Sequence, residues 1–129
     1  MLKSIAIALI ALFATGVVVA QQPAPAGIKR TILQRVEVPN TTYEVVLGMA
    51  EISAGMNAGR HTHPGPETGT VTEGEMVLIV EGQPDRTLKV GDSYQIPTGV
   101  VHDVKASSGA KVVAVYTIPK GQTLAAPAK

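Results

Sequence analysis

Short apolar runs separated by turn-forming residues fill the chain from residue 31 to residue 118. The runs are rich in Val, Ile, Thr and Tyr, and clusters of Gly, Pro, Asn and Asp interrupt them, which is typical of β-strands joined by tight turns. No stretch after residue 20 keeps a helical period for three turns. The pattern therefore predicts strands at Thr31–Val38, Thr42–Ile52, Arg60–His63, Thr70–Thr72, Glu75–Glu81, Ser93–Ile96, Val100–Lys105 and Lys111–Ile118.

Strands this numerous and this short favour an all-β barrel or sandwich, in which closure protects the strand edges. Two runs, Met76–Val80 and Val112–Val115, are apolar at consecutive positions instead of alternating. Such strands are covered on both faces. The barrel interior covers one face, and either a second sheet or a second copy of the chain covers the other. A homodimer is therefore one of two expectations.

The first residues of the chain follow another pattern. From residue 5 to residue 20 the chain is almost continuously apolar, it follows Lys3, and it ends in the small residues Val18 and Ala20. These features are typical of a secretory signal peptide, so we expect cleavage after residue 20 and a periplasmic or secreted protein. The alternative is a retained anchor, but a membrane-spanning helix usually needs about 20 apolar residues. We expect no stable membrane span after cleavage.

The composition of the remaining chain indicates its domain organisation and argues against some classes of partner. The Pro- and Ala-rich residues 21–30 predict a flexible linker, residues 31–118 a single β domain, and residues 119–129 a flexible C-terminal tail. The 11 Lys and Arg nearly balance the 10 Asp and Glu, which argues against nucleic acid as a partner. The chain has no Cys, which excludes disulfides and thiolate chemistry.

All three histidines of the chain lie in two short segments. His61 and His63 are two residues apart, so on a strand their imidazoles point to the same face. Glu67 follows a Pro-Gly-Pro turn that can return its carboxylate to that face, and His102 lies on a later strand, just after Pro97-Thr98-Gly99. Three imidazoles and one carboxylate form a suitable ligand set for a divalent transition metal. An isolated His-x-His pair is weak evidence, but the gathering of every histidine beside one Glu favours a metal site.

The segments that carry these residues resemble the two sequence motifs of the cupin superfamily. The first motif runs from Gly55 to Gly74 and the second from Gly91 to His102, and both match at their glycines, at Pro97 and at the four candidate ligands. The resemblance covers residues 31–118. It is strongest to small, secreted, single-domain bacterial cupins of type 2, which are quercetin-dioxygenase-like.

The resemblance implies an antiparallel double-sheet β-barrel, the cupin jelly roll, with a metal inside one end. It implies His61, His63, Glu67 and His102 as ligands of one divalent ion of iron, manganese, copper, nickel or zinc. One position departs from the pattern, because Ala106 stands where the second motif often has Asn. That Asn is not a metal ligand, so the departure bears on strand packing or pocket polarity.

Strand alternation and the family pattern also suggest which side chains line the pocket. The lone Phe of the chain precedes residue 21, so tyrosines are the aromatic candidates of the mature domain, and an aliphatic pocket favours a small organic ligand. The candidates are Val71, Met76, Leu78, Tyr94, Val100 and Val104. Candidates for an acid or base are Tyr43, Glu73, Glu75 and Tyr94, and no catalytic residue is assigned.

Two functions remain open at this point. The leading hypothesis is a metal-dependent oxidoreductase, dioxygenase-like, that acts on a small organic molecule. The alternative is a non-enzymatic module that binds or senses a metal or a small ligand. Neither metal identity nor substrate follows from the sequence.

Overall fold

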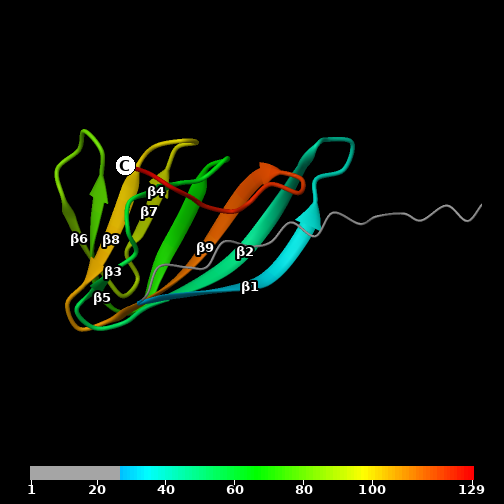
Figure 1. The fold of residues 1–129 in the computed structure, drawn as a ribbon. Coiled ribbons are helices and arrows are strands. Elements are labelled where there is room, and N and C mark those ends of the chain that lie inside the picture. The colour runs from blue at the N-terminus through cyan, green and yellow to red at the C-terminus, as the bar shows by residue number, and fades with distance from the viewer. Residues whose placement is uncertain (1–26) are drawn as a thin grey trace, which may run out of the picture.

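The computed structural model describes residues 27–129, and the expected signal peptide at residues 1–20 lies outside them. The described chain is all-β, without a helix, and every strand pairing is antiparallel (Figure 1). Its strands are β1 (Ile28–Glu37), β2 (Tyr43–Ile52), β3 (Met56–Asn57), β4 (His61–Thr62), β5 (Glu67–Val80), β6 (Arg86–Lys89), β7 (Ser93–Ile96), β8 (His102–Ala106), β9 (Ala110–Pro119) and β10 (Ala126–Pro127). From residue 27 onward we find no helix that could span a bilayer.

The strands form one curled sheet in the order β1-β2-β9-β5-β8-β4-β10. The long strand β5 turns this sheet back on itself. Its first half pairs with β9 and β7, and its second half pairs with β8 and β6. A register shift between Val71 and Glu73 lies shortly before the change of partners, which follows Gly74, and a bulge at such a position bends a strand. Figure 1 shows the resulting half-barrel, and this architecture confirms the expected jelly-roll class.

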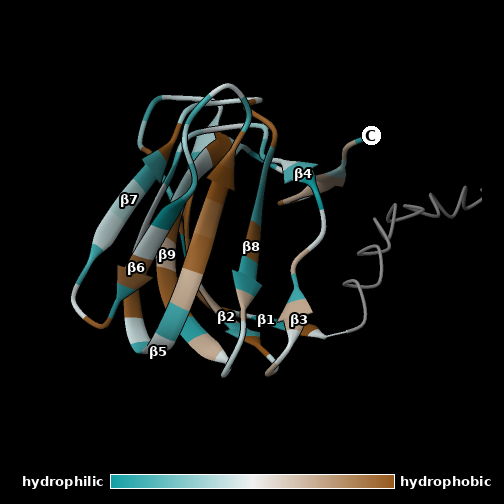
Figure 2. Cartoon of the chain, turned by 90° about the vertical axis from the view of Figure 1, so that its left-hand side faces the viewer, coloured by the Kyte–Doolittle hydropathy of each residue, from teal (hydrophilic) through white to brown (hydrophobic). Residues whose placement is uncertain are grey.

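Alternate residues of the sheet line the interior. On β9 the inward side chains Val112, Ala114, Tyr116 and Ile118 are buried, and they meet the buried inward residues of β2 and β5. The apolar run Met76–Val80 of β5 is visible as a brown segment in Figure 2. Its inward members are Met76, Leu78 and Val80, all of which are buried. The interior is therefore closed by aliphatic side chains.

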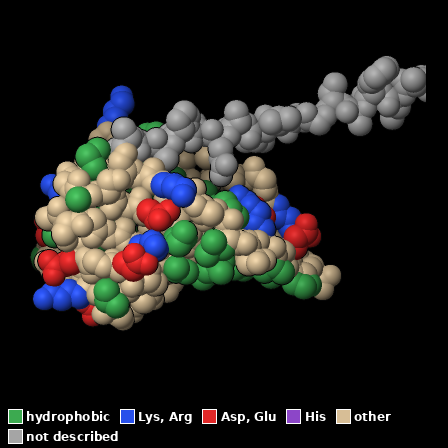
Figure 3. Space-filling view, turned by 90° about the horizontal axis from the view of Figure 1, so that it is seen from below, with side chains coloured by type: hydrophobic (Ala, Val, Ile, Leu, Met, Phe, Trp, Pro, Cys, Tyr) green, Lys and Arg blue, Asp and Glu red, His purple; other side chains and the backbone are tan. Residues whose placement is uncertain are grey.

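The outer face of β2 and β9 is not covered by the other described residues, 27–129. Leu47 pairs with Val115, and Met49 pairs with Val113, on the side opposite the core. Val115 is 40% exposed, although its strand is apolar at consecutive positions. Figure 3 shows hydrophobic side chains gathered on the underside of the molecule as oriented in Figure 1. A second sheet of the same chain does not cover this face within residues 27–129.

The structure changes several expected boundaries. β1 begins at Ile28, so the expected linker over residues 21–30 is wrong for its last three residues. The expected strands Thr70–Thr72 and Glu75–Glu81 are parts of one strand. Gly74 lies between them with φ 71° and still pairs with β9, so no turn separates the two parts. β6 lies in a segment for which no strand was expected.

The expectation of a flexible tail over residues 119–129 is also wrong in part. Leu124 is buried and belongs to the core, and Ala126–Pro127 pair with β4. The tail packs because Leu124 carries an apolar side chain to the interior. It also brings a backbone carbonyl to the site described next.

Candidate metal centre

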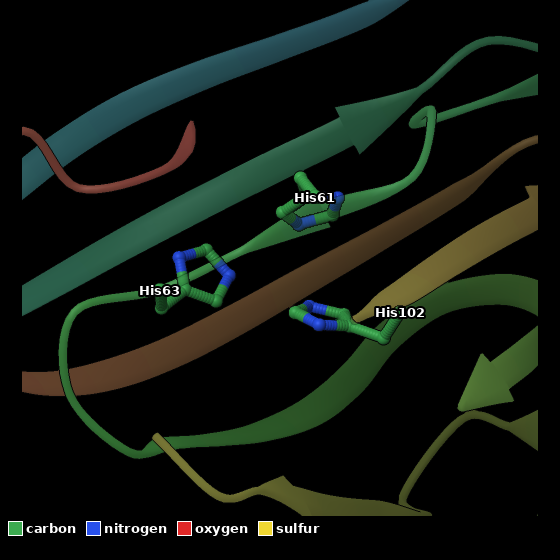
Figure 4. A group of neighbouring side chains, drawn as sticks. All are labelled: His61, His63 and His102. Carbon is green, nitrogen blue, oxygen red and sulfur yellow. The ribbon is translucent and has the colours of Figure 1, made fainter. Parts of the chain in front are cut away.

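Three histidines from two neighbouring strands meet inside the half-barrel (Figure 4). His61 lies on β4 and is directly opposite His102 of β8, while His63 follows β4 by one residue. The ring centroids lie 4.2 Å apart for His61 and His102, and 5.0 Å apart for each pair that includes His63. All three are buried, and one nitrogen of each lies within 4.8 Å of those of the other two.

Backbone carbonyls hold all three rings by the same nitrogen. Nδ1 of His61 lies 2.7 Å from the Gly59 oxygen, and Nδ1 of His102 lies 3.0 Å from the Val100 oxygen. Nδ1 of His63 lies 2.6 Å from the oxygen of Leu124. A carbonyl oxygen only accepts, so each Nδ1 must carry the proton. In the neutral rings each Nε2 then keeps a lone pair, which is the arrangement that ligand histidines adopt.

Glu67 places a buried carboxylate against two of these rings. The Pro64–Pro66 turn returns the chain to β5, and Gly65 has no room for a Cβ because it would meet the Thr117 carbonyl. Oε2 of Glu67 lies 3.0 Å from Nε2 of His63 and 3.3 Å from Nε2 of His102.

This contact leaves two buried atoms without hydrogen bonds. Nε2 of His63 and Oε2 of Glu67 are both buried, and neither makes a hydrogen bond of acceptable geometry within residues 27–129. Two acceptor lone pairs that face one another in a buried site repel unless a cation or a proton lies between them. A divalent transition metal fits this donor set of imidazole nitrogens and one carboxylate oxygen.

Two tyrosines hold the other oxygen of Glu67. The Tyr94 hydroxyl donates to Oε1 at 2.8 Å, and the Tyr116 hydroxyl donates to the same atom at 3.1 Å. Tyr94 comes from β7 and packs over Gly69, where a Cβ would lie 2.5 Å from the tyrosine ring. The two bonds fix the carboxylate so that Oε2 faces the histidines.

Burial and neighbouring charge shift the pKa values of these groups. Burial, together with the proximity of His102, lowers the pKa of His61 to about 4. Burial alone would raise the pKa of Glu67, but hydrogen bonds from His102 and His63 in their protonated forms, and from Tyr94, hold that pKa below its ordinary range. Burial and the Glu67 charge raise the pKa of both Tyr94 and Tyr116, so both remain hydrogen-bond donors. At neutral pH the site therefore presents a neutral His61 and an ionised Glu67.

A cavity of about 30 Å³ adjoins this cluster. Its volume suits a metal ion or a water molecule rather than a large ligand. Arg30 of β1 reaches into it, with Nη2 3.5 Å from Nε2 of His61. The remaining wall is largely apolar, and the lining residues are Ile28, Arg30, Ala50, Ile52, Ala58, His61, Glu67, Tyr94, His102, Val104, Val112 and Tyr116.

Some of the expected pocket residues line this cavity, and others lie in the hydrophobic core. Tyr94 and Val104 line the cavity. Val71, Met76 and Leu78 are buried by 99% or more in the core cluster and do not line it, because aliphatic neighbours fill the space around them. Val100 packs against the core at its edge, and its carbonyl orients His102.

Most of the acid or base candidates lie away from the cluster. Glu73 pairs with Lys111 and Glu75 pairs with Lys89, while Tyr43 is exposed. The sequence reasoning missed Tyr116, although strict alternation along β9 places it inward with Val112. It also missed Arg30, because that residue is the last one of the Pro- and Ala-rich segment 21–30, whose composition predicts a linker.

The sequence of this chain is similar to those of known proteins. Residues 48–119 match the family model described as the cupin domain. The HTH-type transcriptional regulator PuuR of Escherichia coli (strain K12) is 42% identical over 60 residues, which cover 45% of this chain and 32% of that protein. The PuuR of Shigella flexneri matches to the same extent. The chain thus spans about a third of the length of these curated relatives.

Solved structures share the fold at low sequence identity. DMSP lyase DddQ from Ruegeria pomeroyi DSS-3 aligns with a TM-score of 0.66 and 19% identity, over 78% of this chain and 51% of that one. Recombinant oxalate oxidase in complex with glycolate aligns with a TM-score of 0.62 and 21% identity, over 80% and 56%. Salicylate 1,2-dioxygenase from Pseudoaminobacter salicylatoxidans gives 0.59 and 19%, over 78% and 33%. The family match, the curled antiparallel sheet and the histidine cluster agree: the chain belongs to the cupin family.

Proposed function

We propose that this chain is a metal-dependent oxidoreductase, dioxygenase-like, that acts on a small organic molecule. One observation carries the proposal: the three histidines each bring a ring nitrogen within 4.8 Å of the others, Oε2 of Glu67 lies against Nε2 of His63 and His102, and Nε2 of His63 and Oε2 of Glu67 lack hydrogen-bond partners within residues 27–129. His61, His63, His102 and Glu67 would hold the ion. When bound, an open-shell divalent ion such as iron or copper would supply the redox chemistry that oxygen activation needs.

The surrounding residues prepare the site for this role. The carbonyls of Gly59, Val100 and Leu124 fix the rings, so that little reorganisation is needed when the ion enters. The two tyrosines keep Glu67 oriented, while apolar lining residues limit water access. Named neighbours with this fold include a dioxygenase and an oxidase, which supports an oxidoreductase, and a lyase, which shows that the fold also serves other reactions.

We extend the proposal to the location of the protein. The Lys3 start and the apolar residues 5–20 support a cleaved signal peptide and a periplasmic or secreted enzyme. Expression of the full chain in a bacterium, followed by fractionation and N-terminal sequencing, tests this. We expect the exported protein to begin at Gln21, and a membrane-bound chain with Met1 intact would contradict it.

We also propose that two copies pair through the outer face of β2 and β9. Apolar Leu47, Val113 and Val115 lie on this face. Pairs of both signs border it, namely Lys29 with Glu51 and Lys111 with Glu73, so the same patch can meet itself without like-charge repulsion.

The experiment for the main proposal measures metal and turnover in one sample. Protein covering residues 21–129 is analysed for bound metal by mass spectrometry, then loaded with iron and assayed for oxygen consumption over a panel of small enols, diketones and thiols. Turnover above that of free iron, lost in His102→Ala and kept in Arg60→Ala, is expected. Less than about a tenth of an equivalent of transition metal after reconstitution would contradict the site, because four such ligands hold an ion firmly.

A second function has a specific observation in its favour. The curated relatives at 42% identity are named as transcriptional regulators, and the match covers about a third of their length. A cupin domain of this kind can serve as a ligand-binding module in place of an enzyme. Saturable capture of a small ligand by the metal-loaded protein, without turnover, would favour the binding module over the enzyme.

A further inference from the structure

Arg30 lies on β1, a strand outside the residues that match the cupin-domain model. Its cationic side chain points toward the candidate metal centre. On β1 it pairs with Ala50 of β2, and Ala50 lines the cavity as Arg30 does. Its guanidinium reaches Nε2 of His61 at 3.5 Å, which is the outer limit for a hydrogen bond. The side chain is half-buried.

No acidic residue between positions 27 and 129 forms an ion pair with Arg30. Its neighbours on the same strand differ in this respect, because Lys29 pairs with Glu51 and Arg35 pairs with Glu44 at 2.6 Å. Guanidinium carries five donors in a planar fork that matches a carboxylate. In Arg30, the 3.5 Å contact with His61 involves one of these donors, and the fork makes no other side-chain hydrogen bond within residues 27–129.

The charge of the site favours an anion beside Arg30. Three neutral imidazoles and the ionised Glu67 would leave a divalent ion with a net charge of about +1. Arg30 adds a second positive charge, and it is the lone cationic side chain among the cavity-lining residues of the described chain. Partly buried cations are stabilised when an anion pairs with them.

The rest of the lining limits the size and character of such an anion. Ile28, Ile52, Ala58 and Val112 give the cavity an apolar wall. With a volume of about 30 Å³, the cavity has no room for a bulky or aromatic group unless side chains move. A short aliphatic remainder with one charged end suits this environment.

We propose that Arg30 binds the carboxylate of a small aliphatic organic acid and thereby selects the ligand of this centre. The proposal deepens the function proposed above and rests on it for the role of the centre. Arg30 is in this account the residue that determines specificity, and the histidines and Glu67 keep their separate role. The fork accepts the two carboxylate oxygens side by side, so the ligand is held in one orientation at the mouth of the cavity.

A purely structural role for Arg30 makes a different prediction. If the side chain only supports His61, its removal lowers stability or metal affinity and leaves affinity for anions unchanged. If Arg30 binds the ligand, its removal weakens carboxylate binding. Metal affinity then does not fall, because the loss of a nearby positive charge favours a bound cation.

The test uses acetate as the probe and acetamide as its neutral counterpart. Titrations are followed by calorimetry and by the ¹⁵N resonance of the Arg30 side chain, in metal-free and in Zn²⁺-loaded protein of residues 21–129. Zn²⁺ is chosen because it has no redox chemistry. The variants are Arg30→Gln, Arg30→Lys and, as the matched control on the opposite face of β1, Lys29→Gln.

We expect saturable binding of acetate that shifts the Arg30 resonance, and no binding of acetamide. Arg30→Gln should weaken the affinity about 10- to 100-fold, as expected for a charge-assisted pair, and Arg30→Lys should weaken it less. Lys29→Gln should stay within about twofold of the wild type, as a surface change should. Equal affinity in wild type and Arg30→Gln, in both metal-free and loaded protein, would overturn the proposal, as would binding of acetamide as tight as that of acetate.

The two proposals fail in different ways. Failure to take up Zn²⁺ contradicts the metal centre, while the titration of metal-free protein still decides the role of Arg30. If the protein takes up Zn²⁺ but Arg30→Gln binds the anion as tightly as the wild type, only the proposed role of Arg30 is contradicted.

Discussion

The two faces of the sheet formed by β2, β9 and the first half of β5 have opposite chemistry. The inner face carries Tyr116 and Glu67 among aliphatic residues, and these polar groups are buried and bonded to one another. The outer face carries apolar Leu47 and Val115 toward the surroundings, with ion pairs along its border. One strand thus serves a site on one side and a surface on the other, because successive side chains alternate.

The difference between the two faces predicts where a single substitution has a large effect on stability or binding. Inside, each polar atom has lost its water, so the removal of one partner leaves a buried group unsatisfied. Outside, the loss of one apolar side chain changes little within a single copy. Substitutions at four positions test this contrast, and they follow in order of expected effect.

The largest effect is expected on metal affinity. His102→Ala removes one of three imidazoles, so we expect affinity for Zn²⁺ to fall by about 100-fold or more in a chelator-competition titration. Arg60→Ala is the control, since Arg60 is exposed one residue before β4 and pairs with Glu81 on the surface. Affinities that differ less than about threefold between these two variants would show that His102 is not a ligand.

A methyl group at Gly69 should be the next most damaging change. Its Cβ would lie 2.5 Å from the Tyr94 ring, so the tyrosine must leave Glu67. We expect Gly69→Ala to lower the free energy of unfolding by about 2–4 kcal/mol, measured in urea. Gly48→Ala is the matched control on the same inner face, because its Cβ would meet the Tyr116 ring at an ordinary 3.5 Å. Equal losses in the two variants would contradict the packing described for Tyr94.

Tyr116→Phe should have a smaller effect. It removes the 3.1 Å hydrogen bond to Glu67 and nothing else of comparable strength. We expect a loss of about 1.5–3 kcal/mol in the free energy of unfolding, because the acceptor is a buried charge. Tyr43→Phe, at an exposed tyrosine of the same sheet, should cost less than about 0.5 kcal/mol. A loss as small in Tyr116→Phe would mean that Glu67 does not depend on this bond.

The smallest effect on a single copy is expected on the outer face. Val115→Thr should change the free energy of unfolding of a monomer by no more than about 0.5 kcal/mol. Val115→Lys should convert a dimer into a monomer in light scattering, because a charge would enter the proposed contact. A wild-type protein that is monomeric at micromolar concentration would remove the proposed pairing and leave the inner face unaffected.

The sequence predicts the polar ligand set better than the surrounding support. His61, His63 and His102 follow from strand alternation and motif spacing, and the all-β class follows from the short apolar runs. Tyr116 could have been found, because it alternates in phase with Val112. The backbone carbonyl of Leu124 could not, because a carbonyl has no sequence signal and its contact depends on how the tail packs.

Arg30 and β6 show a second limit. Arg30 stands next to residues whose composition favours a linker, while its strand is stabilised by pairing with β2. β6 has few apolar residues and is a strand because it pairs with the second half of β5. In both cases a tertiary neighbour supplies what the local sequence lacks.

The central claim is that three Nδ1 protons are held by carbonyls and three Nε2 lone pairs are left for one ion. Long-range ¹H–¹⁵N spectra of the histidine rings, recorded before and after one equivalent of Zn²⁺, test it directly. We predict that His61, His63 and His102 all carry the proton on Nδ1 without metal, and that all three Nε2 resonances shift together when the ion is added while the Nδ1 protons remain. A proton on Nε2 of any of the three in neutral metal-free protein, or Nε2 resonances that do not respond to Zn²⁺, would contradict the account.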